Sequence, residues 1–170
     1  NDVVPLAEQI GELNAVHERG LARHIGVSNF NTALMAEAVR LSAAPLATNQ
    51  VEYHPYLDQM KVLEAVETHG MALTAYYAMA DGKVVTDPVL REIGAAHGKS
   101  AAQVVLRWLV QQPDVVALTK TATESRLAEN LALFDFVLTP DEMMRIHRLA
   151  RPDGRIVSPD GLAPAWDKAA

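Results

Sequence analysis

Two spacings of apolar residues alternate along the chain and predict its elements. Leu6, Ile10, Leu13 and Val16 recur at helical spacing before Gly20, a residue type that commonly ends helices. Consecutive apolar residues predict four buried strands, at 23–27, 46–52, 71–76 and 115–118. Because helical patterns separate these strands, we expect an α/β fold whose βα repeats build a parallel sheet.

Helix-capping residues mark the elements between the strands. Further helices are expected after Asn31, from Asp58 to Gly70, from Asp87-Pro88, at 101–112 after Ser100, near 123–133 and near 140–149. A loop is expected at 77–86, and prolines and glycines predict an irregular tail over 150–170. No linker or low-complexity block divides the chain, so we expect one domain over 1–170.

Composition narrows the functional classes. The 170 residues are 49% hydrophobic with a formal net charge of −6, which is typical of a globular domain without a basic face for nucleic acid. The absence of cysteine excludes disulfides and thiolate metal sites and favours a cytoplasmic location. No apolar run approaches the roughly 18 residues that span a membrane, and no secretory signal is visible. The chain starts without Met and enters a helix almost at once, so we expect sequence upstream of Asn1.

Polar residues collect near the ends of the predicted strands, where α/β folds bind ligands. Ser28-Asn29 follows the first strand, and this pair has the alternative role of ending a strand and starting a helix. Asn49-Gln50 lies inside the second strand, where buried amides need hydrogen-bond partners that a ligand amide is one way to supply. Tyr76 is either a core residue or a flat surface for stacking on a ring.

Three common nucleotide signatures are absent. The nine glycines include no G-x-G pair and no phosphate loop, and no Tyr is followed by Lys four residues later. The positive signal is Lys120-Thr121 after the fourth strand, followed by Arg126, Glu129 and Asn130. A helix N-terminus after a late barrel strand attracts anions, and Lys and Arg add charge. The alternative is an ordinary turn capped by Thr123, with a solvated Arg126.

Taken in order, these motifs resemble those of the aldo-keto reductases. The matching segments are GVSNF at 26–30, NQVEYHPYL at 49–57, AY at 75–76, and KT at 120–121 with Arg126 and Asn130. The resemblance runs over essentially the whole chain. The tail SPDGLAPAWD at 158–167 is similar to that of bacterial 2,5-diketo-D-gluconate reductases. The family fold is a (β/α)₈ TIM barrel that binds NADPH in an extended conformation without a Rossmann fold, and the chain would supply its C-terminal half, strands five to eight.

The resemblance also implies roles for the first polar clusters. Ser28, Asn29 and Gln50 would hold the nicotinamide carboxamide. Tyr76 would stack on the ring, so that the hydride-bearing carbon meets the substrate carbonyl. Tyr77 departs from the family pattern, which more often has a small residue there, and would narrow the cofactor channel.

The last polar cluster receives its role in the same way. Lys120, Thr121 and Arg126 would hold the adenosine 2′-phosphate, which favours NADPH over NADH. Glu129 and Asn130 would lie near the adenine. Thr121 stands where the family commonly has Ser, and it keeps the hydroxyl.

No catalytic residue is assigned within this chain. The family's proton-donating Tyr, with its supporting Asp, Lys and His, belongs to the first four barrel strands, which the resemblance places upstream of Asn1. Trp166 in the tail would line the substrate pocket. His54 has two interpretations, a residue that orients substrate or, more in keeping with its place before Pro55, a structural histidine. No His, Asp or Glu spacing indicates a metal site.

The leading hypothesis is therefore the cofactor-binding half of an NADPH-dependent oxidoreductase. The whole enzyme would reduce small aldehydes and ketones such as methylglyoxal or diketo sugar acids, and the isolated chain would be inactive. A second hypothesis is a non-catalytic nucleotide-binding or interaction module with a reductase-like fold. A third hypothesis is an open four-stranded α/β module that only resembles the family. The expected partners are a small carbonyl substrate and a missing N-terminal half-barrel, or a second copy joined through open strand edges.

Overall fold

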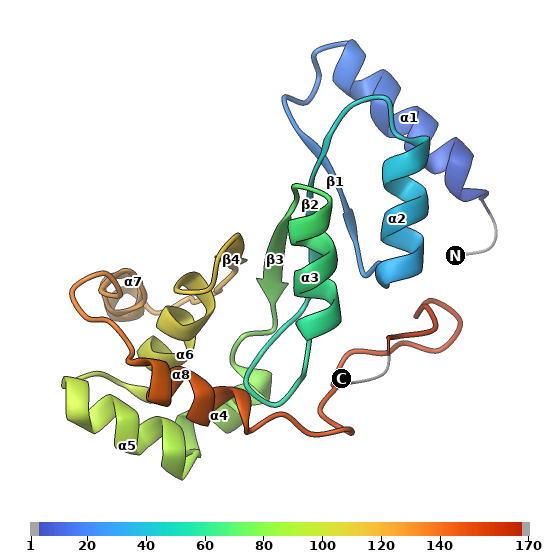
Figure 1. Ribbon diagram of the computed structural model, residues 1–170. Helices are drawn as coiled ribbons and strands as arrows, with labels where there is room; N and C mark the ends of the chain where they lie inside the picture. The colour runs from blue at the N-terminus through green and yellow to red at the C-terminus, as the bar shows by residue number, and fades with distance from the viewer. Residues whose placement is uncertain (1–3, 168–170) are drawn as a thin grey trace. The chain divides into compact units, whose positions relative to one another are not determined.

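The computed structural model describes residues 4–167 as a parallel α/β fold with four strands (Figure 1). The strands are β1 (Ile25–Ser28), β2 (Leu46–Glu52), β3 (Ala72–Tyr76) and β4 (Val115–Ala117). The helices are α1 (Leu6–Glu18), α2 (Thr32–Leu41), α3 (Met60–Thr68), η1 (Ala80–Gly82), α4 (Lys83–Thr86), α5 (Pro88–His97), α6 (Ala101–Val110), α7 (Glu124–Leu131) and α8 (Pro140–His147). The four predicted strands are confirmed, with ends that shift by one or two residues.

The strands follow one another in the sheet in chain order, β1-β2-β3-β4. Parallel pairing sets Val27 opposite Asn49 and Ser28 opposite Gln50, after an irregularity in the register. Gly26 lies at that irregularity, where a Cβ atom would come within 2.7 Å of the Thr48 carbonyl oxygen. Only glycine permits this close approach of the two backbones, so Gly26 fixes how Ser28 meets β2.

The described chain divides into two compact units. Unit 1 holds residues 4–51, 59–74 and 157–167, and unit 2 holds residues 52–58 and 75–156. In unit 1, α1 packs on α2 and α2 on α3, with Ile10, Met35 and Val66 almost completely buried. The predicted cap is confirmed, since the Asn31 side chain accepts a hydrogen bond from the Leu34 N–H at 2.8 Å.

Unit 2 is built around Trp108 on α6. Helix α6 packs against α5 and β4, and the Trp108 ring lies 4.8 Å from the Tyr53 ring and 5.2 Å from the His147 ring. The predicted caps of two helices are confirmed. Asp87 accepts hydrogen bonds from the first-turn N–H groups of α5, and Ser100 forms a capping box with Gln103 on α6.

Two local predictions are wrong. Helix α3 begins at Met60 with Gln59 as its N-cap, so Asp58 does not open it; the backbone first turns at residues 54–57 through a Leu57 N–H bond to the His54 oxygen. The expected loop at 77–86 contains two short helices, η1 and α4. Each is too short to produce a helical spacing of apolar residues in the sequence. Positive φ values at Tyr77, Ala80 and Asp81 start this segment.

The tail has no helix or strand, as predicted, yet it is fixed to each unit it enters. In unit 2, the Arg151 N–H donates to the Tyr56 oxygen at 3.1 Å. In unit 1, Asp167 accepts hydrogen bonds from the Thr32 N–H and hydroxyl at 2.9 and 2.8 Å, at the start of α2. These contacts hold the irregular segment by polar bonds instead of by its own secondary structure.

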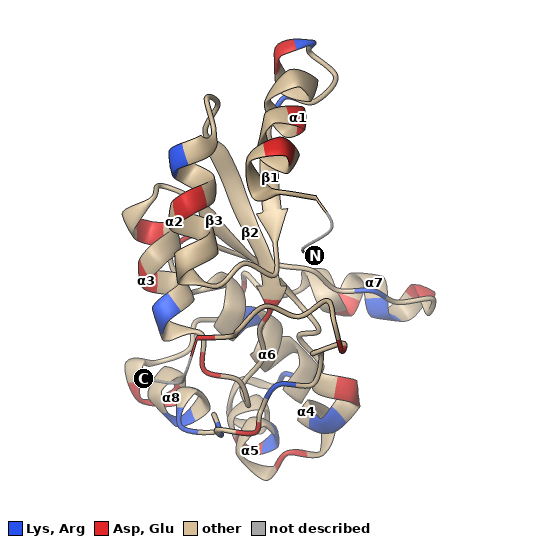
Figure 2. Ribbon diagram, turned by 90° about the vertical axis from the view of Figure 1, so that its right-hand side faces the viewer, with Lys and Arg blue, Asp and Glu red and all other residues tan. Residues whose placement is uncertain are grey.

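Charges of both signs are interspersed along the helices (Figure 2). Among residues 4–167, no helix combines the length and the apolar character that crossing a membrane requires.

Candidate functional site

Ser28 and Asn29, at the end of β1, are bound to the backbone of β2. The Ser28 hydroxyl and the Asn29 N–H both donate to the Gln50 carbonyl oxygen at 2.9 Å. Asn29 has a φ of 58°, a left-handed conformation that asparagine tolerates better than most residues. The strand end is thus turned sharply into the loop before α2, with the Ser28 side chain exposed.

The two amides of β2 have different environments. Asn49 is fully buried and pairs with the backbone of Phe30: its Oδ1 accepts from the N–H at 3.3 Å and its Nδ2 donates to the oxygen at 2.9 Å. This contact, and no ligand amide, supplies the partner that a buried Asn needs. The half-buried Gln50 side chain makes no hydrogen bond within the described residues.

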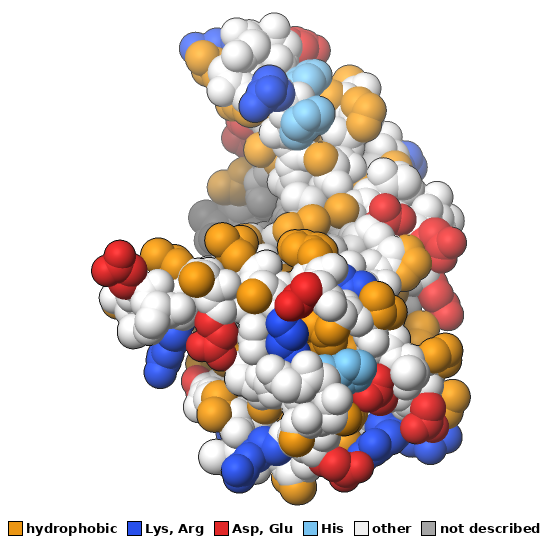
Figure 3. Space-filling view, turned by 90° about the vertical axis from the view of Figure 1, so that its left-hand side faces the viewer, with side chains coloured by type: hydrophobic (Ala, Val, Ile, Leu, Met, Phe, Trp, Pro, Cys, Tyr) orange, Lys and Arg blue, Asp and Glu red, His pale blue; other side chains and the backbone are white. Residues whose placement is uncertain are grey.

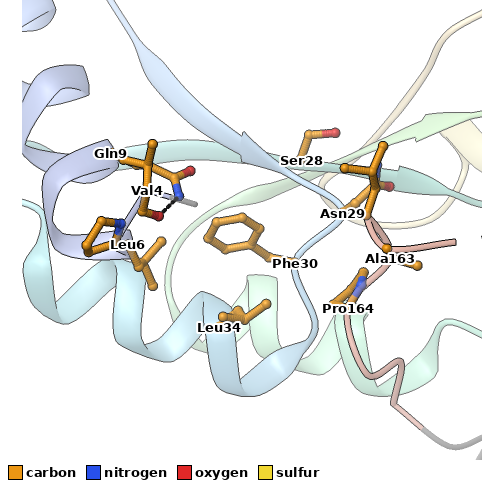
Figure 4. A pocket seen from close by; sticks show the side chains of 12 residues that line it. Val4, Leu6, Gln9, Ser28, Asn29, Phe30, Leu34, Ala163 and Pro164 are labelled. Carbon is orange, nitrogen blue, oxygen red and sulfur yellow. Dashed lines mark hydrogen bonds between the residues drawn. The ribbon is translucent and has the colours of Figure 1, made fainter. Parts of the chain in front are cut away.

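A pocket of about 540 Å³ lies beside the β1–α2 turn in unit 1 (Figure 4). Three segments line it: the start of α1 from Val4 to Gln9, the turn at Ser28–Phe30 with Leu34, and the tail at 161–164. The Phe30 ring lies between the side chains at the start of α1 and those of the tail. Trp166 does not line this pocket; its ring N–H donates to the Ser158 hydroxyl at 3.0 Å.

In unit 2, a second pocket of about 370 Å³ contains the predicted anion-binding residues. The fold brings Lys120, Thr121, Arg126, Glu129 and Asn130 into its wall together. Lys120 and Arg126 are exposed and form no ion pair with any residue of the described range. Their positive charge is therefore not neutralised by a protein carboxylate.

The N-terminus of α7 follows Lys120 and Thr121, which line this pocket, within a few residues. Thr123 is the N-cap residue but its side chain makes no capping hydrogen bond. The Thr123 N–H instead donates to the Thr121 hydroxyl at 3.1 Å. Across residues 4–167, the N–H groups of Glu124 and Ser125 have no hydrogen-bond acceptor. Free first-turn amides favour an anion at this position.

Glu129 and Asn130 are held by neighbouring residues. The Ser100 hydroxyl donates to the Glu129 carboxylate at 2.6 Å, and the Asn130 side chain donates to the Thr119 hydroxyl at 3.3 Å. These bonds tie α7 to the start of α6 and to the end of β4. The carboxylate of Glu129 is therefore engaged, whereas the cations beside it are not.

Tyr76 ends β3 with its ring half-buried, and its carbonyl oxygen accepts the Tyr53 N–H at 3.1 Å. The next residue, Tyr77, is exposed, and its hydroxyl donates to Asp81. That hydrogen bond is the main reason that the pKa of Tyr77 is raised. It closes the turn in which Tyr77 and Asp81 both have positive φ.

His54 lies in the interior of unit 2 with no exposed surface. Its Nε2 is 2.9 Å from the buried Glu52 carboxylate, and its Nδ1 accepts the Tyr56 N–H at 3.3 Å. Glu52 also accepts the Ile156 N–H at 2.7 Å, which fixes the tail to the end of β2. This environment favours the structural interpretation of His54 over a role in substrate orientation.

Several pocket residues carry no recognisable signal in the sequence. Phe30, Leu34 and Leu162 line the unit 1 pocket, and Met79 lines the unit 2 pocket. Phe30 belongs to the GVSNF motif, but nothing local distinguishes it from a core residue. No group of three His, Cys, Asp or Glu side chains within the described ranges is arranged to hold a metal ion.

Comparisons with known proteins agree with this arrangement. The model of the aldo/keto reductase family matches residues 2–151. The methylglyoxal reductase DkgB of Yersinia pestis is 40% identical over 168 residues, which is 98% of this chain and 62% of that protein. That of Salmonella typhimurium is 39% identical over 167 residues, again 62% of its length. The chain thus spans less than two thirds of these relatives.

Solved structures give the same result. A crystal structure assigned as a 2,5-diketo-D-gluconic acid reductase B is 67% identical with a TM-score of 0.96, over 97% of this chain and 59% of that chain. A structure of a Gox0644 variant in complex with NADPH is 31% identical with a TM-score of 0.86, over 93% of this chain and 58% of that one. The protein therefore belongs to the aldo/keto reductase family.

Proposed function

We propose that the chain is the cofactor-binding part of an NADPH-dependent aldo-keto reductase that reduces small aldehydes and ketones. The observation that carries this proposal is the set of binding groups left without protein partners. These groups are the Lys120 and Arg126 cations, the first amides of α7 and the Gln50 carboxamide. A protein surface that served only the fold would not need to gather the two unpaired cations in one pocket wall.

The unit 2 pocket fits the phosphate end of NADPH. The Arg126 guanidinium offers a planar fork, Lys120 a point charge and Thr121 a hydroxyl, while the first turn of α7 offers amides. Together these groups suit the 2′-phosphate that distinguishes NADPH from NADH. Glu129 and Asn130 are placed beside them to contact the adenine.

The turn after β1 fits the nicotinamide end. Ser28, Asn29 and Gln50 present hydroxyl and amide groups that complement a carboxamide, and the β2 backbone holds the turn in place. When bound, NADPH would supply a hydride. The residues of this turn would orient the ring by hydrogen bonds. By resemblance, Tyr76 would be the residue on which the ring stacks.

We further propose that the chain corresponds to strands five to eight of a (β/α)₈ barrel, as one partial domain over 1–170. By resemblance, the proton-donating Tyr and its Asp, Lys and His partners belong to the other half. General acid catalysis needs a positioned proton donor. The chain mixed with NADPH and methylglyoxal should then show no change in cofactor absorbance, and clear turnover would contradict this assignment.

The partner of the chain would cover apolar surface on β4 and α7. Val116, Leu118, Leu127 and Leu131 are 45–74% exposed, and hydrophobic side chains gather on the face in Figure 3. β4 ends the strand order, and an open strand edge favours association. We expect sedimentation to show that the isolated chain self-associates when no N-terminal half-barrel is supplied. A monomer that melts cooperatively would contradict this expectation.

The decisive experiment is a titration of the chain with NADPH and NADH, monitored by cofactor fluorescence. Replacing both Lys120 and Arg126 by Ala should weaken NADPH binding by about 100-fold and leave NADH binding nearly unchanged. The matched control replaces Arg23 and Lys61, two other exposed cations without an ion pair, by Ala. Unchanged NADPH affinity in the first variant would contradict the proposal.

A further inference from the structure

Glu129 on α7 has a near neighbour of opposite charge with which it does not pair. Arg126 precedes it by three residues, a spacing that brings two side chains to one face of a helix and often joins them in an ion pair. Both residues line the unit 2 pocket, yet no ion pair joins Arg126 to Glu129 or to another carboxylate of the described range. A different contact therefore holds the Glu129 carboxylate.

That contact comes from Ser100, the N-cap residue of α6. Its hydroxyl donates to a Glu129 oxygen at 2.6 Å, a short hydrogen bond to a charged acceptor. The same hydroxyl accepts the Gln103 N–H at 3.3 Å, so one side chain both caps α6 and binds α7. The carboxylate thus lies at the N-terminus of α6, where the partial positive charge of the helix favours an anion. Two attractions therefore direct Glu129 toward α6.

The backbone of α7 is fixed at the same place. Helices α6 and α7 are neighbours in unit 2 (Figure 1). The buried Gln103 side chain donates to the carbonyl oxygens of Glu129 and Ala132 at 3.1 and 3.2 Å. Because these bonds hold the end of α7 independently, loss of the Ser100 hydroxyl would release the Glu129 side chain without detaching the helix.

We propose that Ser100 is a positioning residue that keeps Glu129 away from Arg126, so that the guanidinium stays available to the 2′-phosphate of NADPH. This inference rests on the proposed cofactor site and adds a determinant of its preference for NADPH over NADH. Ser100 acts through Glu129. Without the hydroxyl, the carboxylate turns toward Arg126, offsets its charge and repels the phosphate oxygens. The sequence marks Ser100 only as the cap of α6.

The test removes the hydroxyl and retains the cap. Glycine is an acceptable N-cap residue, so Ser100→Gly should leave α6 folded. In fluorescence titrations of the 170-residue chain, this variant should lower the affinity for NADPH about fivefold and the affinity for NADH by less than about twofold. Ser100→Thr, which keeps the hydroxyl, should retain the preference of the unaltered chain. An NADPH preference that is the same in all three proteins would overturn the proposal.

Two further variants separate positioning from a general effect on the fold. Thr139→Gly is the matched control, because Thr139 forms the capping box of α8 in the same unit and does not line the pocket. This control should leave the NADPH-to-NADH preference unchanged. In a Glu129→Gln background, Ser100→Gly should no longer alter that preference, because a carboxamide does not neutralise Arg126. A fivefold loss that persists in this background would show that Ser100 does not act through Glu129 and would refute the proposal.

Chemical modification of Arg126 by phenylglyoxal lets the two proposals fail separately. The reaction contains no cofactor, and mass spectrometry measures its rate at Arg126 against Arg23, an exposed cation without an ion pair. Ser100→Gly should slow the modification of Arg126 about twofold, and adding Glu129→Gln should restore the rate. If the rate changes in this way but the unaltered chain does not prefer NADPH, the cofactor assignment is wrong and Ser100 still positions Glu129. An NADPH preference with no change in rate removes the positioning role and leaves the cofactor site in place.

Discussion

The two candidate regions are built in different ways. In unit 1, the turn after β1 is held by a fully buried amide, Asn49, and by the β2 backbone, beside a pocket. In unit 2, Lys120 and Arg126 are exposed on a pocket wall and no described carboxylate pairs with them. The first region relies on fixed geometry, and the second relies on charge.

This difference suits two kinds of ligand group. A reacting carbonyl needs a rigid wall, because hydride transfer depends on the distance and alignment of two carbons. A phosphate carries most of its binding energy in charge, which tolerates movement of the cations that meet it. The regions should therefore respond differently to mutation, to salt and to truncated ligands.

The largest effect is expected from Asn49→Ala. Removing this buried amide leaves the Phe30 N–H and oxygen without partners and opens a small cavity, at a cost of about 2–4 kcal/mol of unfolding free energy. Urea denaturation measures the change. Asn130→Ala in unit 2, which removes only a contact with Thr119, should change the stability by less than about 0.5 kcal/mol. Equal losses of unfolding free energy in both variants would show that the two regions do not differ in rigidity.

Salt should separate the regions next. Raising ionic strength from about 0.05 M to about 0.5 M should weaken NADPH binding by about tenfold or more, because the exposed Lys120 and Arg126 charges are screened. The unfolding free energy lost on Asn49→Ala, which depends on buried hydrogen bonds in unit 1, should change little over the same range. Fluorescence titrations and urea denaturation at both salt concentrations check this. An NADPH affinity that does not change with ionic strength would show that NADPH binding does not depend on these cations.

Truncating the ligand isolates the contribution of Gln50. Gln50→Leu removes a carboxamide that no described residue binds, so the unfolding free energy should change little. NADPH affinity should fall about fivefold, by loss of one hydrogen bond. The affinity for 2′-phospho-ADP-ribose, which lacks nicotinamide, should stay the same. An equal loss of affinity for both ligands would show that Gln50 does not bind the nicotinamide.

The smallest effect concerns pH. Hydrogen bonds from Lys99 lower the pKa of Asp135 on the surface of unit 2. Because the folded pKa lies below the unfolded value of about 3.9, the pair stabilises the fold above that pH and loses its effect as pH falls through the lowered folded value. Asp135→Asn should therefore reduce stability at neutral pH and converge with the unaltered protein only below the lowered folded pKa, as urea unfolding can measure. In a Lys99→Met background the substitution should have no pH-dependent effect.

Local patterns in the sequence were enough to predict most of the elements and the family. The apolar runs located all four strands, and Asn31, Asp87 and Ser100 marked their helices, because capping and periodicity depend on residues a few positions apart. The sequence also selected five residues of the unit 2 pocket, since the motif keeps them within one turn and one helix: Lys120, Thr121, Arg126, Glu129 and Asn130.

Tertiary packing sets what those residues contact. The partner of Asn49 is the Phe30 backbone, the Asn31 side chain donates to the Ala165 oxygen at a separation of 134 residues, and His54 is enclosed beside Glu52. Leu162 reaches the pocket of Ser28 only because the irregular tail is fixed to the start of α2. Such contacts join positions far apart in the chain, where no local period or spacing records them, and burial then sets which polar groups remain free for a ligand.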